Sequence, residues 1–164
     1  MEQNKLNVNS KKSWFIARLI ATVIISTILI GGKILFLNKV LEDNINPYIN
    51  ITIVVIIGIM ILNTIIYPAI EYKQWYYTIT KDKVEFSEGI FFRERTIIPI
   101  VRIQHIKINE GPINRFLNLA NIKIHTAGGV HKIPNIDREK AEEISHYLKD
   151  KVKEKVNLNA EGEK

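Results

Sequence analysis

The sequence predicts an α+β membrane protein, in which a transmembrane hairpin of two helices precedes an antiparallel β-sheet or small barrel and one C-terminal helix. Three observations support this prediction. Two long apolar runs lie near the N-terminus, the residues after Pro68 alternate between apolar and polar, and the final segment is amphipathic with a helical period. A chain of 164 residues has room for about one folded domain.

The two apolar runs, residues 14–37 and 48–70, are each long enough to cross a bilayer. A hydrocarbon core of about 30 Å needs roughly 20 apolar residues in a helix. Arg18 and Lys33 lie near the ends of the first run, where a long basic side chain reaches the headgroups at modest cost. A pair of buried core helices is the alternative, but a soluble helix of this length normally carries a polar face. We therefore predict two transmembrane helices.

The first run also invites comparison with a signal peptide, because lysines precede it. It ends in "GGKILFLNKV", which contains no cleavage pattern of small residues, so we interpret it as a retained anchor. Cytoplasmic flanks carry an excess of Lys and Arg. Both termini are therefore predicted to be cytoplasmic, with residues 1–13 as an N-terminal tail and residues 38–47 as an external loop. The absence of cysteine fits a reduced cytoplasmic face.

Residues 71–156 are predicted to form a cytoplasmic β-rich domain. Period-two alternation in "WYYTIT", "KVEFSEG", "IFFRERTIIPI", "RIQHIKI", "NIKIH" and "HKIPNI" indicates strands. The alternation slips by one residue around Gln104 and His105, which predicts a β-bulge. Gly111 and Pro112 open a turn or a short helical segment.

A C-terminal helix follows the strands. Asp137 is placed to cap it, and an apolar stripe runs along one side at helical spacing: Ala141, Ile144, Leu148 and Val152. We expect this stripe to pack on the sheet. Residues 157–164 are predicted to be a flexible tail.

The stretch "IPIVRIQHIKINEGPINRFLNLANIKIHTAGG" resembles the signature of bacterial pleckstrin-homology (bPH2) domains of the YdbS-like, membrane-flanked group. The residues that carry the resemblance are Arg102-Ile103-Gln104-His105, Arg115-Phe116-Leu117 and Thr126-Ala127-Gly128-Gly129. One departure is Asn118, where related sequences often carry glycine. The resemblance implies a partly open PH-like β-barrel or sandwich of about seven strands, capped by the C-terminal helix. It implies a binding module, and some members accompany resistance to membrane-active bacteriocins.

The stretch "NIKIHTAGGVHKIP" places two histidines around a glycine pair. If Gly128-Gly129 form a two-residue hairpin turn, His125 and His131 lie on opposite faces and cannot share a metal. A three-residue loop would place them opposite each other, but zinc usually takes at least three protein ligands and cysteine is absent. We predict no metal site. Ile122, Ile124 and Ile133 are then core residues, and Lys123, His125 and Lys132 form a basic outer face.

Residues 89–134 carry seven basic side chains against two acidic ones, which leaves a charge of +5. The inner leaflet is anionic and attracts such a segment, although the same charge could merely keep the domain soluble. The predicted lipid- or partner-binding residues are Arg93, Arg95, Arg102, His105, Lys107, Arg115, Lys123, His125 and Lys132.

The sequence places no convergent acid, base and nucleophile, so we predict neither an enzyme nor a cofactor. A set such as Ser87, His105 and Glu110 has no spacing that supports it. Nucleic acid is not expected, because charge occurs without aromatic-basic clustering. The predicted function is a membrane-anchored binding module that contributes to immunity against membrane-active peptides. The alternatives are an anionic-lipid-binding module and a scaffold that assembles with a larger PH-domain membrane protein or as a homo-oligomer.

Overall fold

The computed structural model describes residues 4–37, 46–90 and 92–162, which form two compact units. The helical hairpin comprises Trp14–Ala69, and the β domain comprises Met1–Ser13 together with Ile70–Lys164. The predicted external loop, residues 38–47, lies largely outside the described residues.

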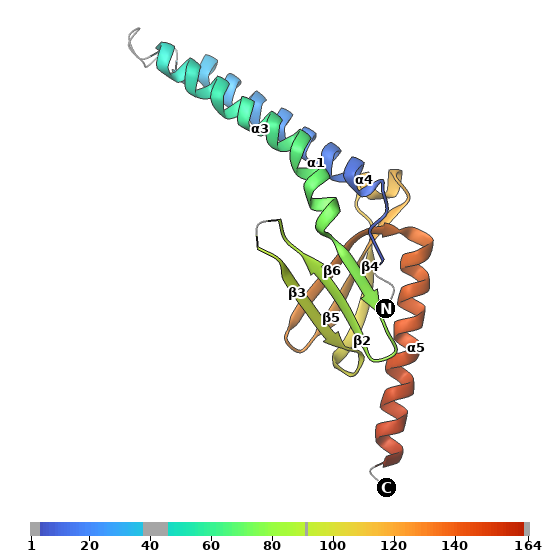
Figure 1. Ribbon diagram of the computed structural model, residues 1–164. Coiled ribbons are helices and arrows are strands. Elements are labelled where there is room, and N and C mark those ends of the chain that lie inside the picture. Colours follow the sequence, from blue (N-terminus) through green and yellow to red (C-terminus); the bar gives the residue numbers. More distant parts are fainter. Residues whose placement is uncertain (1–3, 38–45, 91, 163–164) are drawn as a thin grey trace. The chain divides into compact units, whose positions relative to one another are not determined.

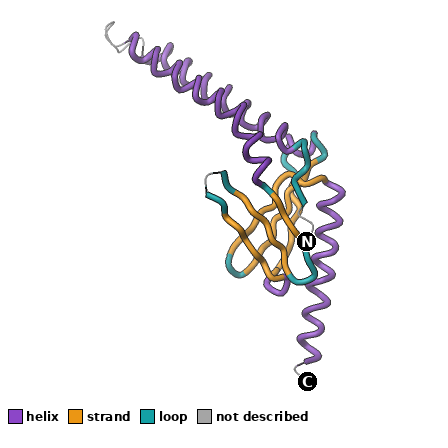
Figure 2. Tube along the Cα trace, viewed as in Figure 1, coloured by secondary structure: helices purple, strands orange, loops and turns teal. Residues whose placement is uncertain are grey.

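The helical hairpin consists of α1 (Ser10–Gly32), which continues as a π-helical turn (η1, Lys33–Leu37), and α3 (Asn46–Gln74) (Figure 2). In each of the two helices only 6% of the most apolar 18-residue window is buried. Exposed apolar surface of this extent disfavours a pair of soluble core helices and is typical of helices in apolar surroundings. Both helices are therefore candidate membrane spans.

Polar side chains join the helices of the hairpin. The hydroxyls of Thr22 and Thr64 form a buried hydrogen bond of 3.0 Å. The guanidinium of Arg18 lies 4.6 Å from the centre of the Tyr67 ring, a cation–π contact that stabilises a positive charge in an apolar setting. The Lys33 ammonium donates a hydrogen bond to the side-chain oxygen of Asn50. Both basic residues of the first apolar run thus contact the second helix.

The β domain is a sandwich of two antiparallel three-stranded sheets with a C-terminal helix, α5 (Arg138–Gly162) (Figure 1). Sheet A has the order β1-β2-β3, and sheet B has the order β4-β5-β6. The elements are β1 (Tyr76–Ile79), β2 (Lys83–Glu88), β3 (Glu94–Pro99), the 3-10 turn η2 (Ile100–Arg102), β4 (Ile103–Asn109), α4 (Pro112–Phe116), β5 (Leu119–Thr126) and β6 (Gly129–Asp137). The PH-like sandwich is confirmed; the described residues form six strands instead of about seven, and the barrel is open.

The core lies between the two sheets and α5. Its fully buried apolar side chains include Val84, Phe86, Ile100, Ile122, Ile124, Ile133 and Leu148. The predicted stripe of α5 faces this core, since Ala141, Ile144 and Leu148 are buried and the helix contacts η2, β4, β5 and β6. The inner residues of the strands and the stripe of the helix therefore share one apolar interior.

The first residues of α5 were predicted from a cap, and its last residues from a domain boundary. The cap is confirmed, because the carboxylate of Asp137 accepts a hydrogen bond of 3.2 Å from the backbone N–H of Glu139. At its other end the helix continues to Gly162, past the predicted boundary at Asn157, and the flexibility of residues 157–164 stays a prediction. Residues 157–161 contain no glycine or proline, and Gly162 is the first poor helix former that the chain meets.

The register of sheet B confirms one prediction and corrects another. The pairing of β4 with β5 shifts between Ile103 and His105, which is the predicted bulge. The hairpin turn, however, is Ala127-Gly128, because Thr126 pairs with Gly129. The Thr126 hydroxyl accepts from the Gly128 N–H at 3.2 Å and donates to the Gly129 carbonyl at 3.1 Å, which fixes the turn one residue earlier.

Asn118, the departure from the family pattern, has a φ of 55°. This is the left-handed region, which glycine occupies freely and which asparagine tolerates better than most residues. The turn between α4 and β5 therefore keeps the geometry that a glycine would supply.

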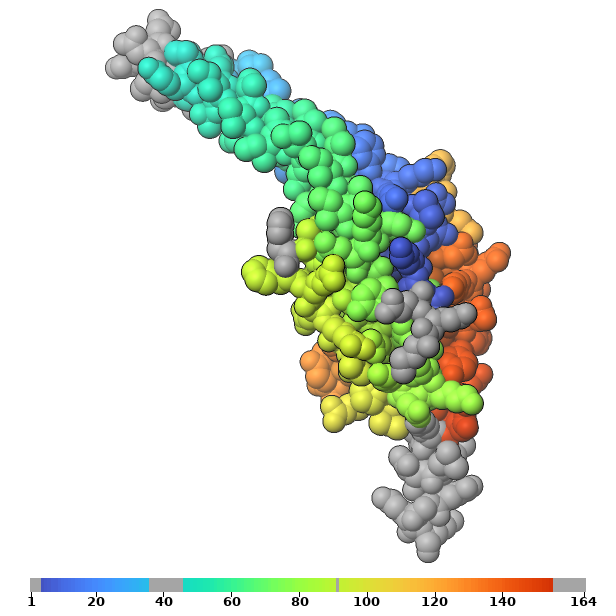
Figure 3. Space-filling model, in the orientation of Figure 1, coloured from blue at the N-terminus to red at the C-terminus, as the bar shows by residue number. Residues whose placement is uncertain are grey.

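The N-terminal segment, residues 4–13, is part of the β domain and not a separate tail. Asn4 pairs with Tyr77 of β1 through two backbone hydrogen bonds of 2.9 Å, and Leu6 is only 3% exposed. Figure 3 shows this segment in dark blue beside the green of β1 and the orange-red of α5. The predicted domain, residues 71–156, therefore lacks a piece of its own structure.

Buried polar contacts hold this segment in place. The Ser10 hydroxyl donates to the Asn135 carbonyl at 3.0 Å, and the Ser13 hydroxyl donates to the Asn114 side chain at 2.5 Å. The Asn114 amide donates in turn to the Asn135 side chain at 2.8 Å. Buried hydrogen bonds of this kind specify position, because any other placement would leave polar groups unpaired.

We expect Leu6→Ala to lower the free energy of unfolding of the β domain by about 2–5 kcal/mol, because it leaves a cavity in a packed site. The measurement is urea unfolding of residues 1–13 joined to residues 70–164 by a flexible Gly-Ser linker. Val8→Ala is the matched control, because Val8 is 64% exposed, and its effect should stay within about 0.5 kcal/mol. Equal stability of the two variants would contradict the packing of this segment.

Candidate functional site

Three lysines form a row across the outer face of sheet B. Lys107 of β4 pairs with Lys123 of β5, and Lys123 pairs with Lys132 of β6. Side chains directly opposite each other on neighbouring strands have Cβ atoms about 4.5–5.5 Å apart. The opposite face of the same strands carries the buried Ile122, Ile124 and Ile133. We refer to Lys107, Lys123 and Lys132 as the lysine row.

Two histidines lie beside the lysine row on the same face. His105 pairs with His125, and their rings stack with centroids 4.0 Å apart and an interplanar angle of 18°. His131 is not part of this pair, because it lies opposite Ile124 and its ring is 6.1 Å from that of the buried Phe86. His125 and His131 therefore lie on opposite faces, as the sequence predicted from a different turn.

The lysine row has no acidic partner within the part of the chain that the structure describes. The ion pairs found there belong to other residues, such as Lys83, Arg95 and Arg138. Like charges placed directly opposite each other destabilise a sheet. An arrangement that costs stability, and that no neighbouring carboxylate relieves, is suited to an anion from outside the domain.

The positive charges around His125 disfavour its protonated form. Partial burial lowers the pKa of the His125 imidazole below its ordinary 6.5, and the nearby His105, Lys107 and Lys123 lower it further. The Nε2 atom of His125 has no hydrogen-bond partner among the described residues. A bound anion would reverse the electrostatic part of this effect, because it would favour the protonated ring.

Arg95, a predicted site residue, forms an ion pair within sheet A. Its guanidinium lies 2.5 Å from a carboxylate oxygen of Glu85, which also pairs with Lys83 at 3.1 Å. Burial raises the pKa of the Glu85 carboxyl, but the hydrogen bonds and charges of Lys83 and Arg95 outweigh it, so the pKa lies below its ordinary 4.5. Arg95 therefore forms an ion pair with a buried carboxylate of its own sheet.

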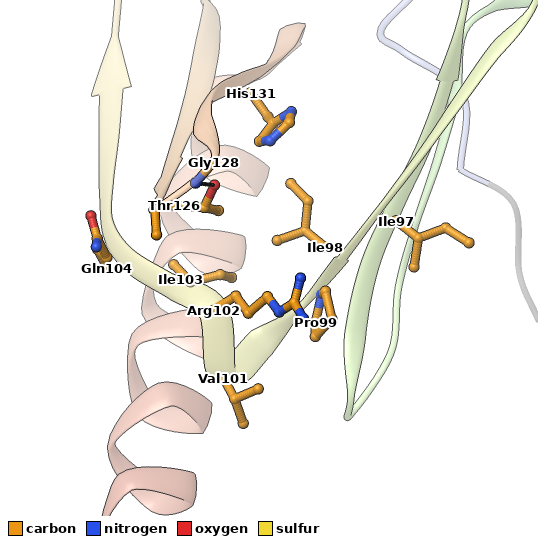
Figure 4. Close-up of a pocket in the computed structure, with 11 residues that line it drawn as sticks. Ile97, Ile98, Pro99, Val101, Arg102, Ile103, Gln104, Thr126, Gly128 and His131 are labelled. Atoms are coloured by element: carbon orange, nitrogen blue, oxygen red, sulfur yellow. Dashed lines mark hydrogen bonds between the residues drawn. The ribbon is translucent and has the colours of Figure 1, made fainter.

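Arg102 lies apart from the lysine row, in a groove between the two sheets. The groove has a volume of about 490 Å³ and is lined by Ile98 and Pro99 of β3, by Ile103 and by His131. Figure 4 shows the Arg102 side chain extended toward Pro99, with Ile98 between it and His131. The outer edge of β3 has no paired strand among the described residues, so its backbone is available on this side.

Arg93 and Arg115 belong to two further segments. Both are exposed, Arg93 just before β3 and Arg115 in α4. The nine predicted residues therefore do not form a single site. His105, Lys107, Lys123, His125 and Lys132 come together, whereas the four arginines do not join them.

Other chemistry gains no support from the geometry. No group of three or more His, Asp or Glu side chains that could hold a metal occurs in the described part of the chain. Ser87 is buried in sheet A, whereas His105 and Glu110 belong to sheet B and the residue after it. These three residues therefore do not form a catalytic set.

The stacking of His105 on His125 is the feature that sequence reasoning missed. The bulge at Gln104 was visible as a slip in the alternation, and it turns His105 to the outer face. Counting the register of β4 against β5 from that bulge would have placed the two histidines opposite each other.

The lowered pKa of His125 predicts a pH dependence. Above pH 6.5 the ring is neutral in both states and contributes nothing; as the pH falls below 6.5, the unfolded chain binds the proton first and the folded state loses stability. We expect the NMR titration of His125, in the full chain in detergent micelles, to have its midpoint below 6.5 and to move upward when inorganic phosphate is added. A midpoint at or above 6.5 without phosphate would contradict the geometry.

Comparison with known proteins supports the fold. A family model described as a bacterial PH domain matches residues 15–152. The transmembrane protein YdbS of Bacillus subtilis (strain 168) is 37% identical over 84 residues, which cover 51% of this chain and 53% of YdbS. The transmembrane protein YdbT of the same organism is 27% identical over 73 residues, which cover 44% of this chain and 15% of YdbT.

The matched region thus spans about half of YdbS and a small part of YdbT. No solved structure matches the chain. The family model nevertheless covers most of the sequence, including both apolar helices. The chain belongs to the bacterial PH domain (bPH2) family and is a membrane-associated member of it.

Proposed function

We propose that this protein is a non-enzymatic binding module, anchored in the membrane by its helical hairpin, whose lysine row binds anionic groups. The observation that carries the proposal is the alignment of Lys107, Lys123 and Lys132 without an acidic partner among the described residues. The anionic groups that we propose are lipid headgroups of the cytoplasmic leaflet, which attract basic residues near the surface.

The proposed orientation places both termini and the β domain in the cytoplasm. It rests on the basic residues that flank the two spans, among them Lys11, Lys12 and Lys73. In this orientation the lysine row is on the side of the bilayer that carries anionic lipid.

We further propose that the protein contributes to resistance against membrane-active peptides. The spans keep the β domain at the bilayer, and the lysine row gives it contacts with the anionic groups that such peptides also use. Two observations support this proposal: the arrangement of two spans next to the β domain, and the resemblance to the membrane-flanked bPH2 group.

A second candidate function is a scaffold that assembles with a larger PH-domain membrane protein. The observation that favours it is the groove beside the unpaired edge of β3, since an extended segment of a partner can add to a free strand edge. Co-purification of a larger membrane protein that is lost on Val101→Arg, at the rim of this groove, would favour the scaffold.

We expect replacement of all three lysines of the row by glutamine to weaken binding to anionic vesicles by about 3 kcal/mol, roughly a hundredfold, because each basic residue near such a surface contributes about 1 kcal/mol. The measurement is vesicle co-sedimentation of the linked β domain at low salt. The matched control replaces Lys5, Lys81 and Lys140, three exposed lysines outside the row. Equal binding by both variants would assign the row to solubility.

The orientation predicts which sites an impermeant thiol reagent reaches in intact cells. The chain has no cysteine, so single cysteines report cleanly. Asn44→Cys, between the spans, should be labelled, whereas Val130→Cys, an exposed site of the β domain, should be labelled only after lysis. The opposite pattern would reverse the orientation.

Resistance is tested in a sensitive Gram-positive host. We expect the full chain to raise the inhibitory concentration of a membrane-active bacteriocin, and residues 1–70 alone or the linked β domain alone to give no protection, because anchor and contacts are separated. The lysine-row variant should lose most of the effect. Full protection by that variant would disconnect resistance from anion binding.

A further inference from the structure

Two phenylalanines of the β domain are almost entirely exposed. Phe92 is 91% exposed and Phe116 is 87% exposed, whereas the next most exposed large apolar residue of the described β domain, Val8, reaches 64%. Single apolar residues on a surface are common. Phe92 and Phe116 make little contact with their own domain. If both lie at one end of the fold, they indicate that this end contacts another molecule or a membrane.

Phe116 lies at the end of the β domain from which the chain enters α1. It belongs to α4, whose Asn114 accepts a hydrogen bond from Ser13. Ser13 is the last residue of the N-terminal segment, and the first apolar run begins at the next residue.

Phe92 lies at the end of the β domain at which α3 passes into β1. Its loop follows Glu88, and the neighbouring Ser87 pairs with Tyr76, the first residue of β1. In Figure 1 the loop before β3 and α4 lie at the same end of the two sheets, and the turn between β5 and β6 lies at the opposite end.

Basic groups accompany both rings. Arg93 follows Phe92, Arg115 precedes Phe116, and both arginines are exposed. At the same end, the ammonium of Lys11 lies 4.5 Å from the centre of the Tyr72 ring. An apolar ring beside a cation suits the interface of a bilayer, where the ring enters the acyl boundary and the cation meets anionic headgroups.

We propose that Phe92 and Phe116 insert into the interfacial region of the bilayer and hold this end of the β domain on the membrane. The occupant is lipid, because both segments adjoin the points where the domain continues into apolar spans, and because the flanking arginines complement an anionic surface. The inference rests on the membrane spans and does not depend on the lysine row.

One consequence concerns the lysine row. β5 begins at Leu119, next to α4, and Lys123 follows four residues later, about 13 Å along the strand. A domain held by its two phenylalanines would therefore present the row near the outer level of the headgroups.

The test uses the full chain in liposomes that contain anionic lipid. Single cysteines at positions 92, 116, 101 and 130 carry an environment-sensitive fluorophore, and lipids with a nitroxide at the headgroup act as quencher. Val101 and Val130 are the matched controls, because each is 57% exposed and lies at the other end of the strands. We expect blue-shifted, strongly quenched emission at 92 and 116 and unquenched emission at 101 and 130.

Equal water exposure at all four sites would overturn the proposal. So would labels at 92 and 116 that are shielded from both water and lipid quencher, because a protein would then cover them. Repeating the measurement with the lysine-row variant separates the two ideas. Quenching at 92 and 116 should persist in that variant, whereas its vesicle binding tests the proposed function alone.

Discussion

The β domain depends on the buried side chain and backbone of Asn135. Its carbonyl accepts from Ser10, its side-chain oxygen accepts from Asn114, and its N–H donates to Asn121 at 3.1 Å. Its φ of 51° turns β6 at this point, a conformation that asparagine tolerates. One residue thus joins the N-terminal segment, α4 and sheet B within the β domain.

Sheet B separates an apolar face from a basic face by the alternation of its strands. Isoleucines on one face exclude water and bind the sheet to α5, whereas lysines and histidines occupy the other face. The inner face stabilises the fold strongly enough to tolerate repulsion between cross-strand lysines on the outer face. Both faces come from the same short segments, because side chains of a strand alternate.

The arginines show why charge in a sequence does not identify a binding surface. Arg95 is held by the buried carboxylate of Glu85, whereas Arg102 lines the groove between the sheets. Arg93 and Arg115 accompany the exposed phenylalanines. Each arginine contributes equally to the net charge of the segment, and only its neighbours in space decide what it can bind.

Periodicity, local turn chemistry and helix capping were enough to predict the two spans, most strands, the bulge, the cap at Asp137 and the basic outer face. Three features became visible only in the folded chain: the turn at Ala127-Gly128, the stacking of His105 on His125 and the inclusion of residues 4–13 in the β domain. These features depend on hydrogen bonds and packing between residues far apart in the chain, such as Ser10 with Asn135. A local pattern carries no record of such a partner, because alternation specifies which face a side chain occupies and not which neighbour it meets there.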